Sequence, residues 1–154
     1  MDEIIPNLFI GDLLDANFVS YRTAQGENDW EIISVTDELP NKSIVHKTTF
    51  IRIRYDKGYE SYAKTKALDV VARKIDKFLR SGKKVLVHCY QGIERSPLSV
   101  AWYLHKKNGI TISDAYEIII LKRPSVLYRG DWLTDDAEIF FSPNDTRLRK
   151  RVGE

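Results

Sequence analysis

The sequence predicts a single-domain α/β protein with a central, mostly parallel sheet flanked by helices on both faces. The run Val85-Leu86-Val87 is wholly apolar, which is typical of a parallel strand that is buried on both faces. Before it lies an amphipathic helical pattern, and after it residues 98–104 form a second, nearly all-apolar helical segment. The first pattern comes from apolar residues spaced by four positions: Ala63, Ala67, Val71, Ile75 and Leu79.

The first half of the chain supplies further strands. We predict a turn and short strand over residues 4–11, and a helix that is capped by Asp12 and runs to about Ala24. Residues 31–36 read as a strand that closes at the turn-forming pair Pro40-Asn41. The alternation over residues 44–55 predicts one or two more strands, so that several strands accumulate around the apolar run.

The second half is predicted to be helical after the central strand. Residues 111–121 form a helix that stops before Pro124, with a core stripe of Ala115, Ile118, Ile119 and Leu121. Residues 131–141 form a last helix. We therefore place one domain at 1–142 and a basic tail at 143–154, either a solvated terminus or a weak site for a phosphate-rich partner.

Composition narrows the class of protein. The chain has 154 residues, of which 43% are hydrophobic and 30% charged, as in ordinary soluble globular proteins. The net charge of +2 indicates no strong preference for nucleic acid. Without a membrane-spanning run or signal pattern, we expect a cytoplasmic monomer that does not bind membranes. A single cysteine excludes an internal disulfide.

That cysteine opens a loop suited to a phosphate group. Cys89 follows the apolar strand, Gly92 stands midway, and Arg95 and Ser96 follow at the start of a helix. The N–H groups of such a loop and the helix N-terminus behind it favour an anion. Arg95 can hold two phosphate oxygens at once, and the same donors favour ionisation of Cys89 to a thiolate. Alone, Cys89 would be read as a small buried hydrophobe at a strand end.

The pattern His88-Cys89-x-x-Gly92-x-x-Arg95-Ser96 resembles the signature phosphate-binding loop (P-loop) of the cysteine-dependent protein phosphatases. The triplet Arg95-Ser96-Pro97 is most similar to the dual-specificity branch of the protein tyrosine phosphatase superfamily, and residues 6–11 resemble the opening of that branch. The resemblance implies a protein tyrosine phosphatase-like fold and a hydrolase that needs no metal or other cofactor. It also implies that phosphate is held by a loop of six residues: Tyr90, Gln91, Gly92, Ile93, Glu94 and Arg95.

A phosphatase of this kind needs an acid that protonates the leaving oxygen. Asp56 is our candidate, because it follows the predicted strand at 50–55 and precedes Cys89 by 33 positions, one strand-helix-strand excursion. Family members carry their general acid at a similar place. Asp37 and Glu60 are the alternatives.

The expected mechanism has two steps. The Cys89 thiolate attacks phosphorus while Arg95 and the loop amides hold the other oxygens, and a phosphocysteine intermediate forms. Water then hydrolyses this intermediate with Asp56 as the base. By resemblance, Ser96 stabilises the departing thiolate and His88 helps to organise the loop.

Glu94 departs from the family pattern, because a carboxylate beside Arg95 would repel a phosphate dianion. We therefore expect Glu94 to point outward and to pair with a basic residue of a neighbouring loop. Relatives often have a small residue at this position.

The expected substrates are proteins or peptides that carry phosphotyrosine, and also phosphoserine or phosphothreonine. The segment at 37–43 is too short to form the wall of a deep pocket that would select phosphotyrosine alone. Phosphoinositides and RNA 5′-phosphates stay open as alternatives, and so does a phosphate-binding module without turnover. Rhodaneses and arsenate reductases also use a cysteine in an anion loop, but a sulfurtransferase needs neither Asp56 nor Ser96.

Overall fold

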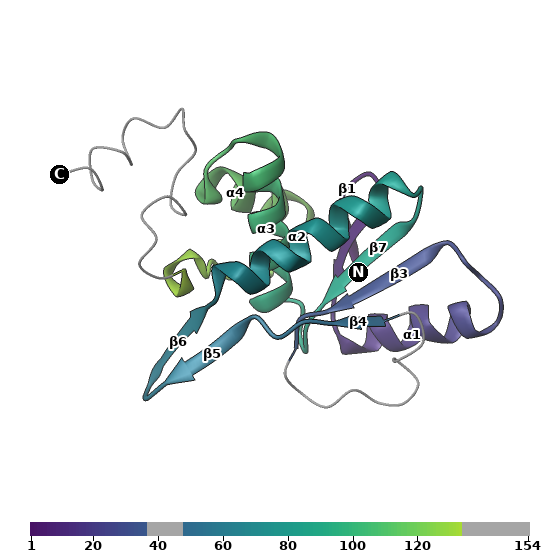
Figure 1. The fold of residues 1–154 in the computed structure, drawn as a ribbon, viewed down its shortest axis with the longest axis horizontal. Helices are drawn as coiled ribbons and strands as arrows, with labels where there is room; N and C mark the ends of the chain where they lie inside the picture. Colours follow the sequence, from purple (N-terminus) through teal and green to yellow (C-terminus); the bar gives the residue numbers. More distant parts are fainter. Residues whose placement is uncertain (37–47, 134–154) are drawn as a thin grey trace.

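The computed structural model describes residues 1–36 and 48–133, and within them a five-stranded sheet forms the centre of the fold (Figure 1). The strand order is β1-β2-β7-β3-β4, in which β2, β7, β3 and β4 are parallel and β1 is antiparallel to β2. The strands are β1 (Asp2–Ile5), β2 (Leu8–Gly11), β3 (Trp30–Ser34), β4 (Thr48–Phe50) and β7 (Lys84–His88). The apolar run at Val85 is therefore in the middle strand, as predicted.

Helices cover both faces of the sheet, which confirms the predicted fold class (Figure 1). Alternate side chains of β7 show the two faces: Leu86 packs in a small cluster with Ala16 of α1, whereas Val85 and Val87 belong to the larger core. The helix on the first face is α1 (Leu13–Ala24), and those on the second are α2 (Thr65–Arg80), α3 (Arg95–Asn108) and α4 (Ile112–Lys122).

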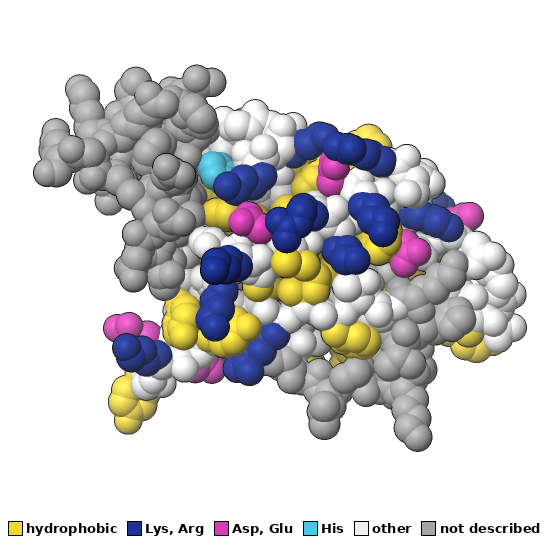
Figure 2. Space-filling model, in the orientation of Figure 1, with side chains coloured by type: hydrophobic (Ala, Val, Ile, Leu, Met, Phe, Trp, Pro, Cys, Tyr) yellow, Lys and Arg dark blue, Asp and Glu magenta, His cyan; other side chains and the backbone are white. Residues whose placement is uncertain are grey.

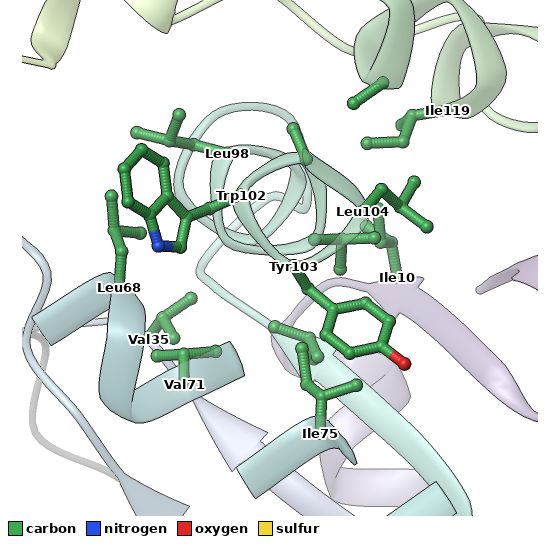
Figure 3. Close-up of a cluster of buried hydrophobic side chains, with 14 of the residues drawn as sticks. Ile10, Val35, Leu68, Val71, Ile75, Leu98, Trp102, Tyr103, Leu104 and Ile119 are labelled. Atoms are coloured by element: carbon green, nitrogen blue, oxygen red, sulfur yellow. The ribbon is translucent and has the colours of Figure 1, made fainter. Parts of the chain in front are cut away.

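Helix α3 lies at the centre of the larger core. Every residue from Arg95 to His105 is buried, so the helix is enclosed on all sides. Figure 3 shows Trp102 beside Leu68 of α2 and Tyr103 beside Ile75. The Trp102 indole also donates a hydrogen bond of 2.8 Å to Asp69, so its polar atom is satisfied. This packing fixes the helix whose first residue is Arg95.

The carboxyl ends of the parallel strands meet at one edge of the sheet. Gly11 and Ser34 each pair with His88, and Phe50 pairs with Ser34, so that all four strand ends stand in register. Cys89 is the next residue after His88. Ligands of open α/β sheets bind at such an edge, and the loop that we predict to bind phosphate begins there.

Two predicted strand assignments were incomplete. Residues 2–11 form a hairpin of β1 and β2, because Asn7 takes the left-handed conformation (φ +68°) that a tight turn needs. The predicted strand over 50–55 is interrupted at residues 51–53, and a separate hairpin of β5 (Arg54–Lys57) and β6 (Glu60–Ala63) follows. Its turn contains Gly58 at φ +62°. Ala63 therefore ends a strand and does not lie in the helix.

The buried stripe predicted for α4 was partly wrong. Ala115 and Ile119 are buried and Ile118 is partly buried, but Leu121 is 83% exposed, because a residue two positions after Ile119 lies on another side of the helix. Beyond α4 the described chain ends in a short 3₁₀ helix, η2 (Gly130–Trp132). The predicted loop at 37–43, most of the helix at 131–141, the boundary at 142 and the basic tail lie outside the described residues.

Within the described segments, no helix combines the length and the apolar character that a membrane span requires.

The start of α1 is fixed by a capping box that a single substitution can test. The Asp12 carboxylate accepts a hydrogen bond of 2.8 Å from the Asp15 amide, and the Asp15 carboxylate accepts one of 3.0 Å from the Asp12 amide. Asp12→Ala should lower the free energy of unfolding by about 1 kcal/mol in urea titrations, whereas Asp12→Asn keeps the acceptor and should cost only a fraction of that. Equal losses in the two variants would contradict this role.

Candidate active site

Arg123 holds the outer side of the loop that follows β7. Its Nε donates a hydrogen bond of 2.8 Å to the Gly92 carbonyl, and its Nη2 donates one of 3.3 Å to the Gln91 carbonyl. The third nitrogen, Nη1, forms an ion pair of 2.7 Å with Asp2 of β1. One mostly buried guanidinium thus ties the loop to an edge strand.

Two backbone groups hold the neighbouring carbonyls. The Leu13 amide, at the start of α1, donates to the Tyr90 carbonyl at 3.0 Å, and the Leu127 amide donates to the Ile93 carbonyl at 3.0 Å. Together with Arg123, these donors bind the carbonyls of four successive loop residues from outside the loop. Because the carbonyls point outward, the loop amides are free to face the interior, as an anion site requires.

Gly92 allows the loop to close tightly over Cys89. Its φ of +70° favours glycine, and a Cβ at this position would lie 2.6 Å from the Gly11 carbonyl oxygen. The Gly92 amide donates a hydrogen bond of 3.2 Å to Cys89 Sγ. The Gly92 N–H therefore points toward the interior of the loop, at the sulfur of Cys89.

Two further residues contact Cys89: Ser96 at its thiol and His88 at its backbone carbonyl. Ser96 Oγ lies 3.3 Å from Cys89 Sγ, within hydrogen-bonding range for sulfur. His88 is fully buried, and its Nδ1 lies 3.0 Å from the Cys89 carbonyl oxygen. Burial lowers the pKa of His88 below its ordinary 6.5, so the ring is neutral at pH 7 and can donate from Nδ1 to that carbonyl. Cys89 itself is only 2% exposed.

Arg95 is positioned from two sides. It opens the enclosed helix α3, and its Nη1 donates a hydrogen bond of 3.1 Å to Thr36 Oγ1, just beyond β3. Although Arg95 is charged, it is only 7% exposed. No side chain caps the start of α3 at Glu94, so the first N–H groups of this helix are left to serve a ligand.

These groups surround a small cavity of about 210 Å³. Its walls are formed by Arg54, Cys89, Tyr90, Gln91, Ile93, Glu94 and Arg95. The cavity is thus lined by Cys89, by Arg95 and by four other members of the predicted phosphate-binding set, but not by Gly92. Two arginines, one side-chain thiol and a helix N-terminus converge here, which suits a phosphate ester.

Asp56 is not among the residues that line this cavity. It lies on β5, where its side chain is 53% exposed and accepts a hydrogen bond of 2.7 Å from Ser61. Arg54, two residues earlier and therefore on the same face of the strand, does line the cavity. Asp56 thus lies two residues further along β5 than the cavity-lining Arg54, and its catalytic role stays a prediction. Of the alternatives, Glu60 lines a neighbouring cavity and Asp37 lies outside the described residues.

Glu94 has the partner that the sequence led us to expect. Its carboxylate accepts a hydrogen bond of 2.9 Å from Arg129 Nε, on the segment that follows α4. This bond raises the pKa of Arg129 above its ordinary value. Glu94 still lines the cavity. Its negative charge is therefore offset by the ion pair with Arg129, although the residue does not point wholly away from the site.

Sequence reasoning missed three residues of this site: Arg54, Thr36 and Arg123. Arg54 lies within the predicted strand at 50–55 and Thr36 is the last residue of the predicted strand at 31–36, so only their position near a strand end marks them. Arg123 stands between a helix and Pro124, and a basic residue at a helix end is too common to indicate a loop contact. Among the residues that the structure describes, no group of three or more His, Cys, Asp or Glu side chains forms a metal-binding cluster.

A loop that opens with a cysteine and ends with an arginine lies at the carboxyl edge of a parallel sheet, an arrangement that suits the binding of a phosphate group. Residues 27–133 match the family model of the dual specificity phosphatase catalytic domain. The chain belongs to this dual specificity phosphatase family, which confirms the resemblance drawn from the loop.

Curated relatives carry the same family name. The chain is 30% identical over 126 residues to dual specificity protein phosphatase 1B of Arabidopsis thaliana, a match that covers 80% of this chain and 71% of that protein. It is 28% identical over 134 residues to dual specificity protein phosphatase 8 of Mus musculus, covering 82% of this chain. This match spans 19% of the length of the mouse protein.

Solved structures show the same fold. Human tyrosine phosphatase-like serine/threonine/tyrosine-interacting protein superposes with a TM-score of 0.68 at 24% identity, covering 86% of this chain and 89% of that one. PTPMT1, in a complex with PI(5)P, superposes with a TM-score of 0.69 at 20% identity, covering 98% and 95%.

We predict that Arg123 supports activity by holding the loop in position. Arg123→Ala leaves the Gln91 and Gly92 carbonyls without their donor and should lower kcat/KM for p-nitrophenyl phosphate by about 10² fold, since small displacements of aligned groups are costly. Asp2→Asn removes only the charge of its ion-pair partner and should stay within about threefold of wild type. Similar rates for Arg123→Ala and wild type would rule out this positioning role.

Glu94 offers a second test of the site. Glu94→Ala should leave kcat/KM within about tenfold of wild type, because Arg129 already neutralises the carboxylate. Arg129→Ala should be more harmful and raise KM, since it leaves an unpaired carboxylate at the cavity wall. Steady-state kinetics on both variants measure this order. A hundredfold gain in substrate affinity in Glu94→Ala would show that the carboxylate opposes phosphate binding.

Proposed function

We propose that this chain hydrolyses phosphoric monoesters through a phosphocysteine intermediate and needs no metal. The observation that carries the proposal is the set of groups around Cys89 Sγ: the Gly92 amide at 3.2 Å, Ser96 Oγ at 3.3 Å, and the Arg95 guanidinium in the same cavity. Membership of the dual specificity phosphatase family supports a phosphatase activity.

In the first step, the Cys89 thiolate attacks phosphorus in line with the leaving oxygen. The new S–P bond forms as the P–O bond to the leaving group breaks. Arg95 and the inward-facing amides hold the equatorial oxygens, where negative charge gathers. Asp56 gives its proton to the leaving alkoxide or phenoxide, which would otherwise be a poor leaving group. Because the Asp56 side chain is exposed on β5, a bound substrate could approach its carboxyl group.

In the second step, water attacks the phosphocysteine and the S–P bond breaks. Asp56, now ionised, accepts the proton of that water, and inorganic phosphate is released. The Ser96 hydroxyl donates to the departing Cys89 thiolate, which it can reach at the distance observed. The buried, neutral His88 holds the Cys89 carbonyl in place through both steps.

The proposed substrates are phosphotyrosine, phosphoserine and phosphothreonine in proteins or peptides. The family name and a small cavity with an exposed Tyr90 at its edge support this class. The likeness of the fold to PTPMT1, whose solved structure contains PI(5)P, makes a phosphoinositide the alternative substrate. The cytoplasmic location and monomeric state expected from the sequence stay predictions.

The test is the release of p-nitrophenol from p-nitrophenyl phosphate in the presence of EDTA, across a range of pH. Cys89→Ser should abolish turnover, because the nucleophile is lost. Asp56→Asn should lower kcat by about 10²–10⁴ fold and remove the decline of the rate at high pH, because that decline reports the loss of the acid's proton. Glu60→Gln is the matched control on the same hairpin and should keep the wild-type pH profile.

Each contrary result has a distinct meaning. If Glu60→Gln and not Asp56→Asn loses the high-pH decline, the acid is assigned to the wrong residue of the hairpin. Binding of a phosphopeptide without any turnover would indicate a phosphate-binding module. Phosphate release from phosphotyrosine peptide, phosphothreonine peptide and PI(5)P, compared by kcat/KM, then decides the substrate class.

A further inference from the structure

A second hollow lies between α2 and α3, near the C-terminal ends of both helices. It has a volume of about 680 Å³ and shares no lining residue with the catalytic cavity. We call it the α2–α3 groove. It is lined by Ala72, Arg73, Asp76, Lys77, Arg80, Ser81, Tyr103, Lys106 and Lys107. The proposed catalytic chemistry uses none of these residues.

The groove is strongly basic. Five of its lining residues are Lys or Arg, against a single carboxylate, Asp76. Figure 2 shows this excess as dark-blue side chains spread over the face that α2 presents. Asp76 is already shared between Arg80, at 2.7 Å, and Lys107, at 3.1 Å. Arg73 and Lys77 are exposed, and among the described residues neither side chain has an ion-pair or hydrogen-bond partner.

Helix stability explains only part of this charge. Lys77, Arg80, Lys106 and Lys107 lie in the last turns of their helices, where cations offset the negative end of the helix dipole. Arg73 lies outside the last turn of α2, so the dipole does not account for it. Arg73, Lys77 and Arg80 instead share one face of α2 and extend over about 10 Å along its axis.

The floor of the groove is apolar. Ala72 is half-buried, and Tyr103 is only 5% exposed although it bears a phenol. Burial, together with the nearby Asp76 carboxylate, raises the pKa of Tyr103 above its ordinary value, so the phenol is neutral. An occupant that fits the groove must therefore present carboxylates to the basic rim and apolar side chains to the floor.

We propose that the α2–α3 groove is a docking site for an acidic segment of a partner protein that interleaves Asp or Glu with apolar residues. Charge complementarity with the rim and burial against the floor both favour this occupant. A lipid surface fits poorly, because the apolar groups are recessed and none protrudes to enter a bilayer. Nucleic acid fits poorly, because the floor offers no exposed aromatic face for base stacking. The inference is independent of the proposed catalytic activity.

The experiment measures binding by fluorescence anisotropy, with a fluorescein-labelled peptide of four Glu-Glu-Leu repeats and a matched peptide of Gln-Gln-Leu repeats. Wild type should bind the acidic peptide more tightly, and the affinity should fall as salt rises. Arg73→Glu combined with Lys77→Glu should weaken binding by about tenfold or more. Lys66→Glu combined with Lys122→Glu changes the net charge equally at exposed positions outside the groove and should leave the affinity nearly unchanged.

Circular dichroism establishes that each variant is folded, and Arg73→Gln combined with Lys77→Gln gives a milder version of the same test. Equal weakening in the groove pair and the control pair would overturn the proposal, because it would show attraction to overall charge alone. Absence of binding to the acidic peptide would overturn it as well. So would tighter binding of a labelled single-stranded oligonucleotide, or of vesicles that contain phosphatidylserine, that is lost in the groove variants.

Discussion

The outward orientation of the loop carbonyls is the constraint on which the candidate active site depends. A loop between a strand and a helix has carbonyls and amides in equal number, and an anion site needs the amides inside. In this protein, donors from three parts of the chain bind four successive carbonyls: the start of α1, Arg123 after α4, and Leu127 beyond it. Residues outside the loop therefore fix its conformation as much as the residues within it do.

The rigidity of this arrangement comes from the core. Helix α3 is buried over eleven residues, from Arg95 to His105, and β7 is the middle strand of the sheet. The loop thus joins two largely buried elements, and neither end can shift without disturbing the packing of Trp102 or Val87. A charged residue such as Arg95 can be kept buried here because Thr36 accepts one of its hydrogen bonds and the proposed phosphate would accept others.

Ion pairs set the charge around the site. Glu94 would weaken a phosphate site if it were alone, but Arg129 binds it, and Asp2 similarly completes the contacts of Arg123. Both arginines lie after α4, so this segment supplies one cation to the Gln91 and Gly92 carbonyls and another to the Glu94 carboxylate. Away from the site, the cations that line the α2–α3 groove outnumber its one carboxylate, so the groove and the catalytic cavity differ in the partners that they can attract.

The sequence alone determined the fold class, the central strand, the phosphate-binding loop and the family, because each is a local pattern: an apolar run, a four-residue spacing, or a nine-residue motif. It also indicated that Glu94 needs a cationic partner. Only the tertiary structure decided that this partner is Arg129, that Arg123 holds the loop, and that β5 and β6 form a hairpin which carries Asp56 outside the cavity wall. These facts depend on contacts between residues far apart in the chain, as Arg123 and Asp2 are. Such contacts leave no periodic or local signature in a single sequence.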